Sequence, residues 1–199
     1  MLSKIKAFIL RLSVPFQKWI QRRGRRETVM TKELVDKILR LSMPGDIILS
    51  YESQRWTSFF IKGFYDHAVI ISSKGTVVES VGDKWINQNG SLVNVGGVRE
   101  VDLEEWLYKK DFVAVIRVDH AAAYIAGMNS LKYIGRDYDY YFSHDNELVY
   151  CSELPYMCWR TEWPLFLAEH DADKEILPQQ YLDYVNVLDY LELVFDSRG

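Results

Sequence analysis

Apolar side chains recur at three- and four-residue intervals over the first twenty positions of the chain, and basic side chains stand between them. The apolar set is Ile5, Phe8, Ile9, Leu12, Phe16, Trp19 and Ile20. This periodicity predicts a basic amphipathic helix, which Pro15 kinks or divides. A helix of this kind docks on a protein partner, lies on an anionic membrane surface, or packs on its own domain.

A basic run with the sequence RRGRR follows at residues 22–26. It could contact phosphates, but it lacks the interleaved aromatic side chains that stack on bases, so a solvated linker is the better interpretation. We expect residues 1–30 to form an N-terminal extension and residues 31–199 to form one domain. Nucleic acid is not expected as a partner.

The domain begins with a second helical pattern, which Thr31 can cap and which the segment 43–46 ends. Short β-branched runs bounded by Gly, Asp or Lys then predict strands at residues 47–51, 67–72, 76–81 and 112–118. The break at 73–75 makes the second and third of these strands a hairpin. Further helices are predicted at residues 121–133 and 152–159. Strands followed by helices, without regular alternation, indicate an α+β fold built on a small antiparallel sheet or barrel.

Length and composition provide for one substantial core, because the chain has 199 residues and 48% of them are hydrophobic. The formal net charge is -4, yet residues 1–40 contain eleven Lys/Arg against Glu27, Glu33 and Asp36, so that part carries +8 and the rest -12. No stretch has the roughly 20 uninterrupted apolar residues of a membrane span, and the first apolar run is broken too early for a signal peptide. A cytoplasmic or virion-associated protein is therefore expected.

The two cysteines lie seven residues apart, in the segment predicted to be the last helix. That spacing separates the Cα atoms by about 10 Å, whereas a disulfide requires less than about 7 Å, so Cys151 and Cys158 are expected as free thiols. Cys151 stands where the helix begins, and the exposed backbone N–H groups and the helix dipole favour a reactive thiolate there. The alternative is a small buried hydrophobic residue, which is also the role expected of Cys158.

A nucleophilic cysteine needs a base within hydrogen-bond reach, and the chain has four histidines. His67 opens the apolar run HAVII, so a strand at the sheet edge holds its side chain. The surroundings of His120, His144 and His170 are turns or polar loops, where solvated side chains are expected. His67 has an alternative role as a buried histidine of the core.

The imidazole of such a base must be oriented by a carboxylate or an amide on its second ring nitrogen. Glu79 fits this task, because it ends the run TVVE on the partner strand of the predicted hairpin. By strand alternation it could instead point to solvent. Asp66 is a second candidate, but adjacent strand residues face opposite sides, so its side chain should point away from His67.

A zinc site is the chief chemical alternative, since Cys151, Cys158 and His67 or His144 supply zinc-type ligands. Their spacing matches no short zinc hairpin, and the sequence contains no CxxC or HExxH motif. The two glycines at 96–97 lack the context of a nucleotide-binding loop. We therefore expect neither a metal nor a cofactor.

Four segments together resemble a known pattern: PGDIILS, DHAVII, TVVES and VYCSELPY. They are similar to the permuted branch of the NlpC-type papain-like hydrolases, the YiiX/YebB-like proteins, which are related to the lecithin:retinol acyltransferase group. The resemblance covers roughly residues 40–160. In this branch the histidine strand precedes the cysteine-bearing helix, as it does here, whereas ordinary papain-like enzymes have the reverse order.

The resemblance implies a permuted papain-like fold, in which a small antiparallel sheet or barrel packs against helices. It implies that Cys151 is the nucleophile, His67 the general base and Glu79 the third polar residue, with a thioester intermediate. The backbone N–H of Cys151 is one expected oxyanion donor. Pro155 departs from the family pattern, but it falls in the first helical turn, where proline is tolerated.

Three functions follow as hypotheses. The first is a cysteine amidase or endopeptidase that cleaves a peptide, with bacterial cell-wall peptides as the family's best-known substrate class. The second is an acyltransferase or thioesterase acting on lipids, which the related group suggests and the basic helix favours. The third is a non-catalytic structural or virion-associated binding module, attached to a larger assembly through residues 1–26.

Overall fold

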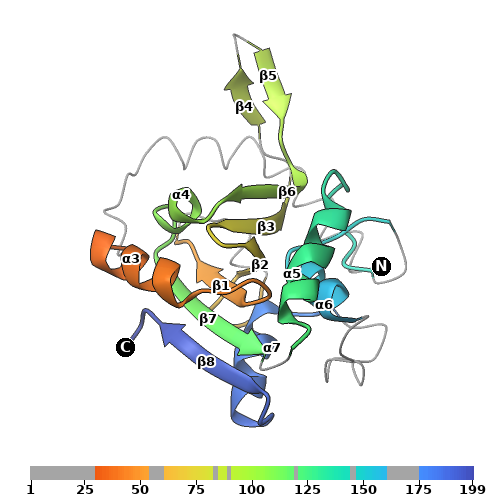
Figure 1. Ribbon diagram of the computed structural model, residues 1–199. Helices are drawn as coiled ribbons and strands as arrows, with labels where there is room; N and C mark the ends of the chain where they lie inside the picture. Colours follow the sequence, from red (N-terminus) through yellow and green to blue (C-terminus); the bar gives the residue numbers. More distant parts are fainter. Residues whose placement is uncertain are drawn as a thin grey trace.

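The computed structural model describes residues 30–53, 61–82, 85–88, 91–118, 121–143, 147–160 and 175–199 (Figure 1). The predicted basic helix and the run 22–26 lie outside the described residues, as do His120, His144 and His170. The division of the chain into extension and domain therefore stays a prediction.

A six-stranded antiparallel sheet forms the centre of the fold, with the strand order β6-β3-β2-β1-β7-β8. Its strands are β1 (Ile47–Tyr51), β2 (His67–Ser73), β3 (Thr76–Val81), β6 (Gly97–Asp102), β7 (Phe112–Val118) and β8 (Leu191–Asp196). β6 and β8 form the two edges, so this sheet is open and not closed into a barrel. A separate ribbon of β4 (Trp85–Gln88) and β5 (Ser91–Asn94) projects from the body (Figure 1).

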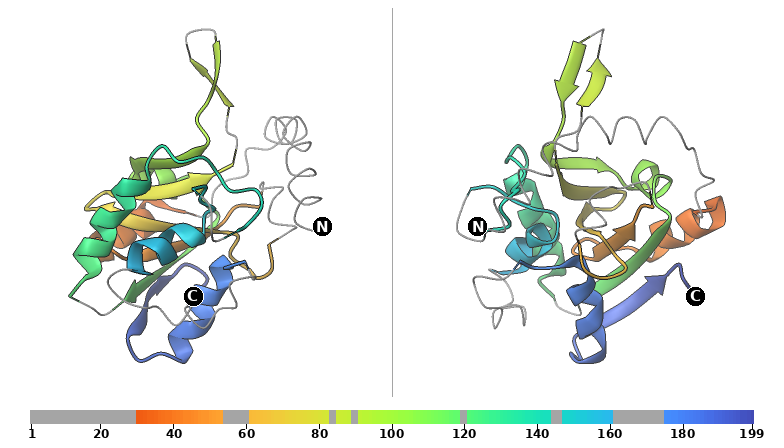
Figure 2. Two further views of the ribbon diagram at one scale, coloured as in Figure 1. Left: turned by 90° about the vertical axis from the view of Figure 1, so that its right-hand side faces the viewer. Right: turned by 180° about the vertical axis from the view of Figure 1, so that it is seen from behind.

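Helices cover both sides of the sheet, which confirms the predicted α+β class. They are α3 (Lys32–Leu41), α4 (Leu103–Leu107), α5 (Ala123–Ser130), α6 (Glu153–Arg160) and α7 (Pro178–Asp183), with 3-10 turns at Leu131–Tyr133 and Tyr184–Asn186. The helices α3 and α4 lie on one side, and α5 and α6 on the other (Figures 1 and 2). Within the described ranges, no helix has the length and apolar character needed to cross a membrane.

The central strand β2 divides the apolar residues into two cores, one on each side of the sheet. Ala68 and Ile70 pack in the core that includes residues of α5 and α6. Val69 and Ile71 pack in the core that includes residues of α3 and α4. This division follows from the two-residue period of a strand, and it explains why the run HAVII has no polar position between His67 and Ser72.

The predicted elements agree with the structure to within two residues at most of their ends. The Thr31 side chain accepts a hydrogen bond from the Leu34 backbone and caps α3, and the predicted hairpin is the β2–β3 pair. The helix predicted at 121–133 is shorter and ends in a 3-10 turn. The spacing of Tyr124 and Met128 predicts an apolar face that packs on the core, but both side chains are exposed while Ala126 is buried.

The PGD turn between α3 and β1 packs against α5 and α6 on the other side of the sheet. Asp46 accepts hydrogen bonds from the Met43 backbone and, through both carboxylate oxygens, from the guanidinium of Arg117 on β7. The indole Nε1 of Trp159 on α6 donates to the Gly45 carbonyl over 3.2 Å. Gly45 has a φ of 90°, and a Cβ there would clash with the Ala123 carbonyl at the start of α5. The turn is therefore a packing element of the fold.

We predict that Gly45→Ala lowers the free energy of unfolding by about 3 kcal/mol or more, because it combines left-handed strain with a backbone clash. Gly75→Ala is the matched control, since Gly75 has a similar φ of 91° but open space around its Cβ position. That change should cost only about 1 kcal/mol. Urea unfolding measures both values, and equal losses would show that α5 does not depend on this close approach.

Candidate active site

His67 and Glu79 meet in the interior of the protein. The imidazole Nε2 of His67 lies 3.3 Å from Oε2 of Glu79, and both side chains are buried. The strand register explains the contact: Ile70 pairs with Val78 on the neighbouring strand, so His67 and Glu79 fall on one face as diagonal neighbours. The carboxylate that contacts the imidazole Nε2 is therefore that of Glu79.

Three donors converge on the Glu79 carboxylate. Arg99, its direct partner across the β3–β6 ladder, donates to Oε1 from Nε over 3.0 Å and from Nη2 over 2.5 Å. Trp106 of α4 donates from its indole Nε1 to Oε2 over 2.9 Å, and His67 contacts that same oxygen. Because both oxygens are engaged, the carboxylate has a fixed position and a fixed plane.

The surroundings hold Glu79 in its charged form. Burial alone raises the pKa of a carboxylate, but the hydrogen bond and charge of His67, followed by the charges of Lys110 and Arg99, outweigh burial here. The pKa of Glu79 is therefore well below its usual value. At neutral pH, Glu79 is an anion aimed at one ring nitrogen of a buried histidine.

Cys151 lies at the entry to α6, and both cysteines of the chain are free thiols, as predicted. The Leu154 N–H donates to the Tyr150 carbonyl, so Cys151 already occupies the first helical turn although regular helix begins at Glu153. Cys151 is 4% exposed. Its position gives its backbone N–H the orientation of an N-terminal helix donor.

Cys158 differs from Cys151 in its surroundings. It is fully buried in the core on the α5 and α6 side, and burial raises the pKa of its thiol far above the ordinary value. A thiol in this environment is inert. The structure thus agrees with the prediction that Cys158 is a packing residue.

A short strand contact fixes the segment that leads to Cys151. Val149 forms a parallel bridge with Tyr138, its N–H donates to the Asp137 carbonyl over 3.1 Å, and its carbonyl accepts from Asp139 over 3.3 Å. The hydroxyl of Ser80 also donates to the Val149 carbonyl over 2.5 Å. Since Ser80 follows Glu79 on β3, one strand supports both the histidine partner and the cysteine segment.

The C-terminal part of the chain secures the other side of Cys151. Ser152 donates from its hydroxyl to the Ile176 carbonyl over 2.6 Å, and the Ile176 N–H donates to the Tyr150 hydroxyl over 2.9 Å. Tyr181 of α7 donates to the Ser152 carbonyl over 2.7 Å. Both neighbours of the cysteine are therefore locked in place by residues far away in the sequence, which no local pattern identifies.

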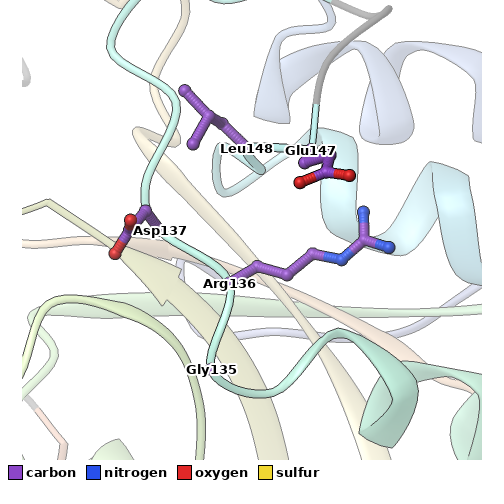
Figure 3. Close-up of a pocket in the computed structure, with 5 residues that line it drawn as sticks. All are labelled: Gly135, Arg136, Asp137, Glu147 and Leu148. Carbon is purple, nitrogen blue, oxygen red and sulfur yellow. The ribbon is translucent and has the colours of Figure 1, made fainter.

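An open pocket of about 370 Å³ lies beside this segment. Its lining consists of Gly135, Arg136, Asp137, Glu147 and Leu148. The side chains of Arg136 and Glu147 face each other across it, while Asp137 points to the opposite side (Figure 3). Cys151, His67 and Glu79 do not line this pocket, which adjoins the cysteine segment through Leu148 and through Asp137, whose carbonyl accepts from the Val149 N–H.

The contacts of His67 and Glu79 do not fit a metal centre. Among the residues described by the structure, no group of three or more His, Cys, Asp or Glu side chains is placed to hold an ion. The Glu79 oxygens already accept from Arg99 and Trp106, and the imidazole Nε2 of His67 faces Glu79. The donors gathered here fit a buried carboxylate–imidazole pair and not a metal ligand set.

An open antiparallel sheet, a histidine–carboxylate pair on adjacent strands and a later cysteine at a helix start fit the permuted papain-like arrangement that the sequence resembles. Residues 42–173 match the family of permuted papain-like amidases of the YaeF/YiiX type, known as C92 peptidases. The chain belongs to this family, which places it in the general class of papain-like cysteine amidases.

A solved structure agrees with this fold. The crystal structure of the metalloprotein YiiX from Escherichia coli O157:H7 superposes with a TM-score of 0.51 at 18% sequence identity, and the match covers 79% of this chain and 98% of that one. No curated protein matches the chain.

Proposed function

We propose that the chain is a cysteine amidase or endopeptidase in which Cys151 is the nucleophile, His67 the base and Glu79 the residue that orients His67. The observation that carries this proposal is the buried contact between His67 Nε2 and the ionised Glu79. A carboxylate in that position selects the tautomer with the proton on Nε2. The other ring nitrogen, Nδ1, then has the lone pair that can accept the thiol proton.

The proposed reaction has two stages. The Cys151 proton moves to Nδ1 of His67, and the thiolate attacks the carbonyl carbon of the scissile amide. The oxyanion accepts a hydrogen bond from the Cys151 backbone N–H, and the amine leaves with the proton from His67, which gives a thioester. In the second stage His67 takes a proton from water, the hydroxide attacks the thioester, and the acid product leaves as the Cys151 thiol forms again.

Cys151 and Glu79 would approach His67 from different sides of the sheet. Glu79 faces Trp106 of α4 on one side of the sheet, whereas Ser80 faces the cysteine segment on the other. His67 is the first residue of β2, so its ring lies at the end of the strand and not within a continuous face. Cys151 would reach Nδ1 around that end.

Substrate preference should follow the charged pocket beside the cysteine segment. Arg136 can bind a carboxylate, and Asp137 and Glu147 can bind an amine. A short peptide with both kinds of group fits this lining better than an uncharged acyl chain. Bacterial cell-wall peptides remain the leading candidates within that class.

The bond type is tested by incubating the protein with short peptides, including cell-wall stem peptides, and in parallel with phospholipid vesicles. We expect new free amines from the peptides, followed by mass spectrometry, and none with Cys151→Ala. Lipid turnover without peptide cleavage would replace this proposal with the acyltransferase or thioesterase alternative. Binding of peptides without turnover, unchanged in Cys151→Ala, would favour the non-catalytic module.

A further inference from the structure

Arg99 occupies a position that the cysteine, histidine and glutamate roles leave unexplained. It lies opposite Glu79 in the ladder between β3 and β6, and two of its guanidinium nitrogens donate to the same oxygen, Oε1. Its third nitrogen donates to the Val95 carbonyl over 3.3 Å. The Arg99 side chain is 24% exposed and that of Glu79 only 3%, so a partly solvated charge is bonded directly to a buried anion.

The other oxygen of Glu79, Oε2, contacts His67 and the neutral indole of Trp106. Trp106 donates to Oε2, and the ammonium of Lys110 lies 4.2 Å from the centre of the indole ring. Lys110 forms an ion pair with Glu52. Lys110 therefore acts on Glu79 through space and has Glu52 as its ion-pair partner, whereas Arg99 is hydrogen-bonded to Glu79 directly.

This charge distribution determines how strongly Glu79 can stabilise an imidazolium. A lone buried carboxylate favours protonation of a neighbouring histidine, and an arginine bonded to that carboxylate offsets the effect. Arg99 and His67 contact the two oxygens of one carboxylate, so the charge of Arg99 lies close enough to lower the proton affinity of His67. Partial solvation of its side chain reduces that influence.

We propose that Arg99 is a positioning residue that sets the proton affinity of His67 through Glu79, by limiting how strongly the carboxylate favours protonation of the imidazole. This inference rests on the proposed role of His67. Trp106 contributes by fixing the plane of the carboxylate and adds no charge. A substitution at Arg99 should therefore change the titration of His67 according to the charge that it retains.

Other charged or titratable groups lie on the elements around His67, and the comparison must keep them constant. They are Glu52 after β1, Asp66 before β2, Lys110 after α4, and Cys151 and Glu153 at the start of α6. Replacing Cys151 with alanine in every protein removes the thiol titration. The carboxylates and Lys110 are unchanged in the Arg99 and Trp106 variants.

The test is an NMR titration of His67 in the full chain carrying Cys151→Ala, with the His67 signal identified by its loss in His67→Gln. We expect Arg99→Gln to move the titration midpoint up by about one pH unit. Arg99→Lys keeps the charge and should move it by less than half as much. Trp106→Phe removes one neutral hydrogen bond and should leave it nearly in place.

Equal midpoints for Arg99→Gln and Arg99→Lys would overturn the inference, because the loss of a purely structural arginine would have the same effect on His67 in both variants. Lys110→Gln is an independent check: it also removes a positive charge that acts on Glu79, and it should also shift the midpoint upward. Circular dichroism confirms that each variant is folded. The titration uses neither the thiol nor a substrate, so an inactive wild-type protein would refute the proposed function without deciding this result.

Discussion

Cys151→Ala should lower peptide hydrolysis by about 10³-fold or more while leaving the fold intact. The nucleophile forms the covalent bond of the proposed first stage, and no other described thiol can replace it, because Cys158 is fully buried. The alanine side chain fits the space of the cysteine, so the loss of stability should be about 1 kcal/mol. Initial rates on the cleaved peptide and thermal unfolding of the same samples measure the two effects.

Cys158→Ala is the matched control for that result. It removes the same atoms from the same helix, two turns further along, at a site with no proposed chemistry. We expect activity within about threefold of wild type, with a stability loss of about 1 to 2 kcal/mol from the small cavity. If both alanine variants lose activity equally, the loss reflects unfolding of α6 and not removal of a nucleophile.

Glu79→Ala should be among the most destabilising single changes in the chain, at about 3 to 5 kcal/mol. It leaves the guanidinium of Arg99 and the indole of Trp106 without the acceptor that they share, in a buried site. Glu79→Gln keeps the shape and one acceptor oxygen, so it should cost less. Denaturant unfolding at neutral pH ranks the two variants.

The pH dependence gives a second signature of Glu79. Its pKa in the folded protein is lowered, so the stability from its ionised form is complete above the unfolded value near 4.5 and is lost as pH falls through the lower folded value. The difference in unfolding free energy between wild type and Glu79→Gln should therefore be constant down to about pH 5 and shrink below it. A difference independent of pH down to strong acid would contradict the assigned charge.

The sequence was sufficient to predict the strands that carry the site. The runs 47–51, 76–81 and 112–118 match β1, β3 and β7 at both ends, since each is a β-branched segment with turn residues at its limits. The twelve-residue separation of His67 and Glu79 across a tight hairpin then predicts their contact. Local pattern was enough here because both partners belong to one supersecondary unit.

Contacts between distant segments could not be predicted in this way. Arg99 lies next to Glu100 in the edge strand β6, and adjacent charged residues in a sequence indicate solvated side chains. Only the β3–β6 register places it opposite Glu79. The same holds for Trp106, whose helix is only five residues long, and for Tyr181, which reaches the cysteine turn from α7.

The exposed face of α5 shows a second limit of pattern reasoning. Tyr124 and Met128 are spaced as a helical apolar stripe, which favours burial. In the structure the small residues Ala126 and Gly127 face the sheet, because the Gly127 position lies against the Ile71 carbonyl. The face of α5 that packs on the sheet is therefore the one with small side chains, which allow the two backbones to lie close together. The large apolar side chains are on the exposed face.

Iodoacetamide alkylation, with Cys151 and Cys158 followed separately by peptide mass spectrometry, tests the proposed thiol–imidazole pair most directly. The reaction is run from about pH 4 to about pH 9 on wild type and His67→Ala. We predict that Cys151 reacts well below pH 7 in wild type and loses that reactivity in His67→Ala, while Cys158 stays unmodified in both. Reaction of Cys151 only near pH 8.5, with or without His67, would show that no activated thiol exists.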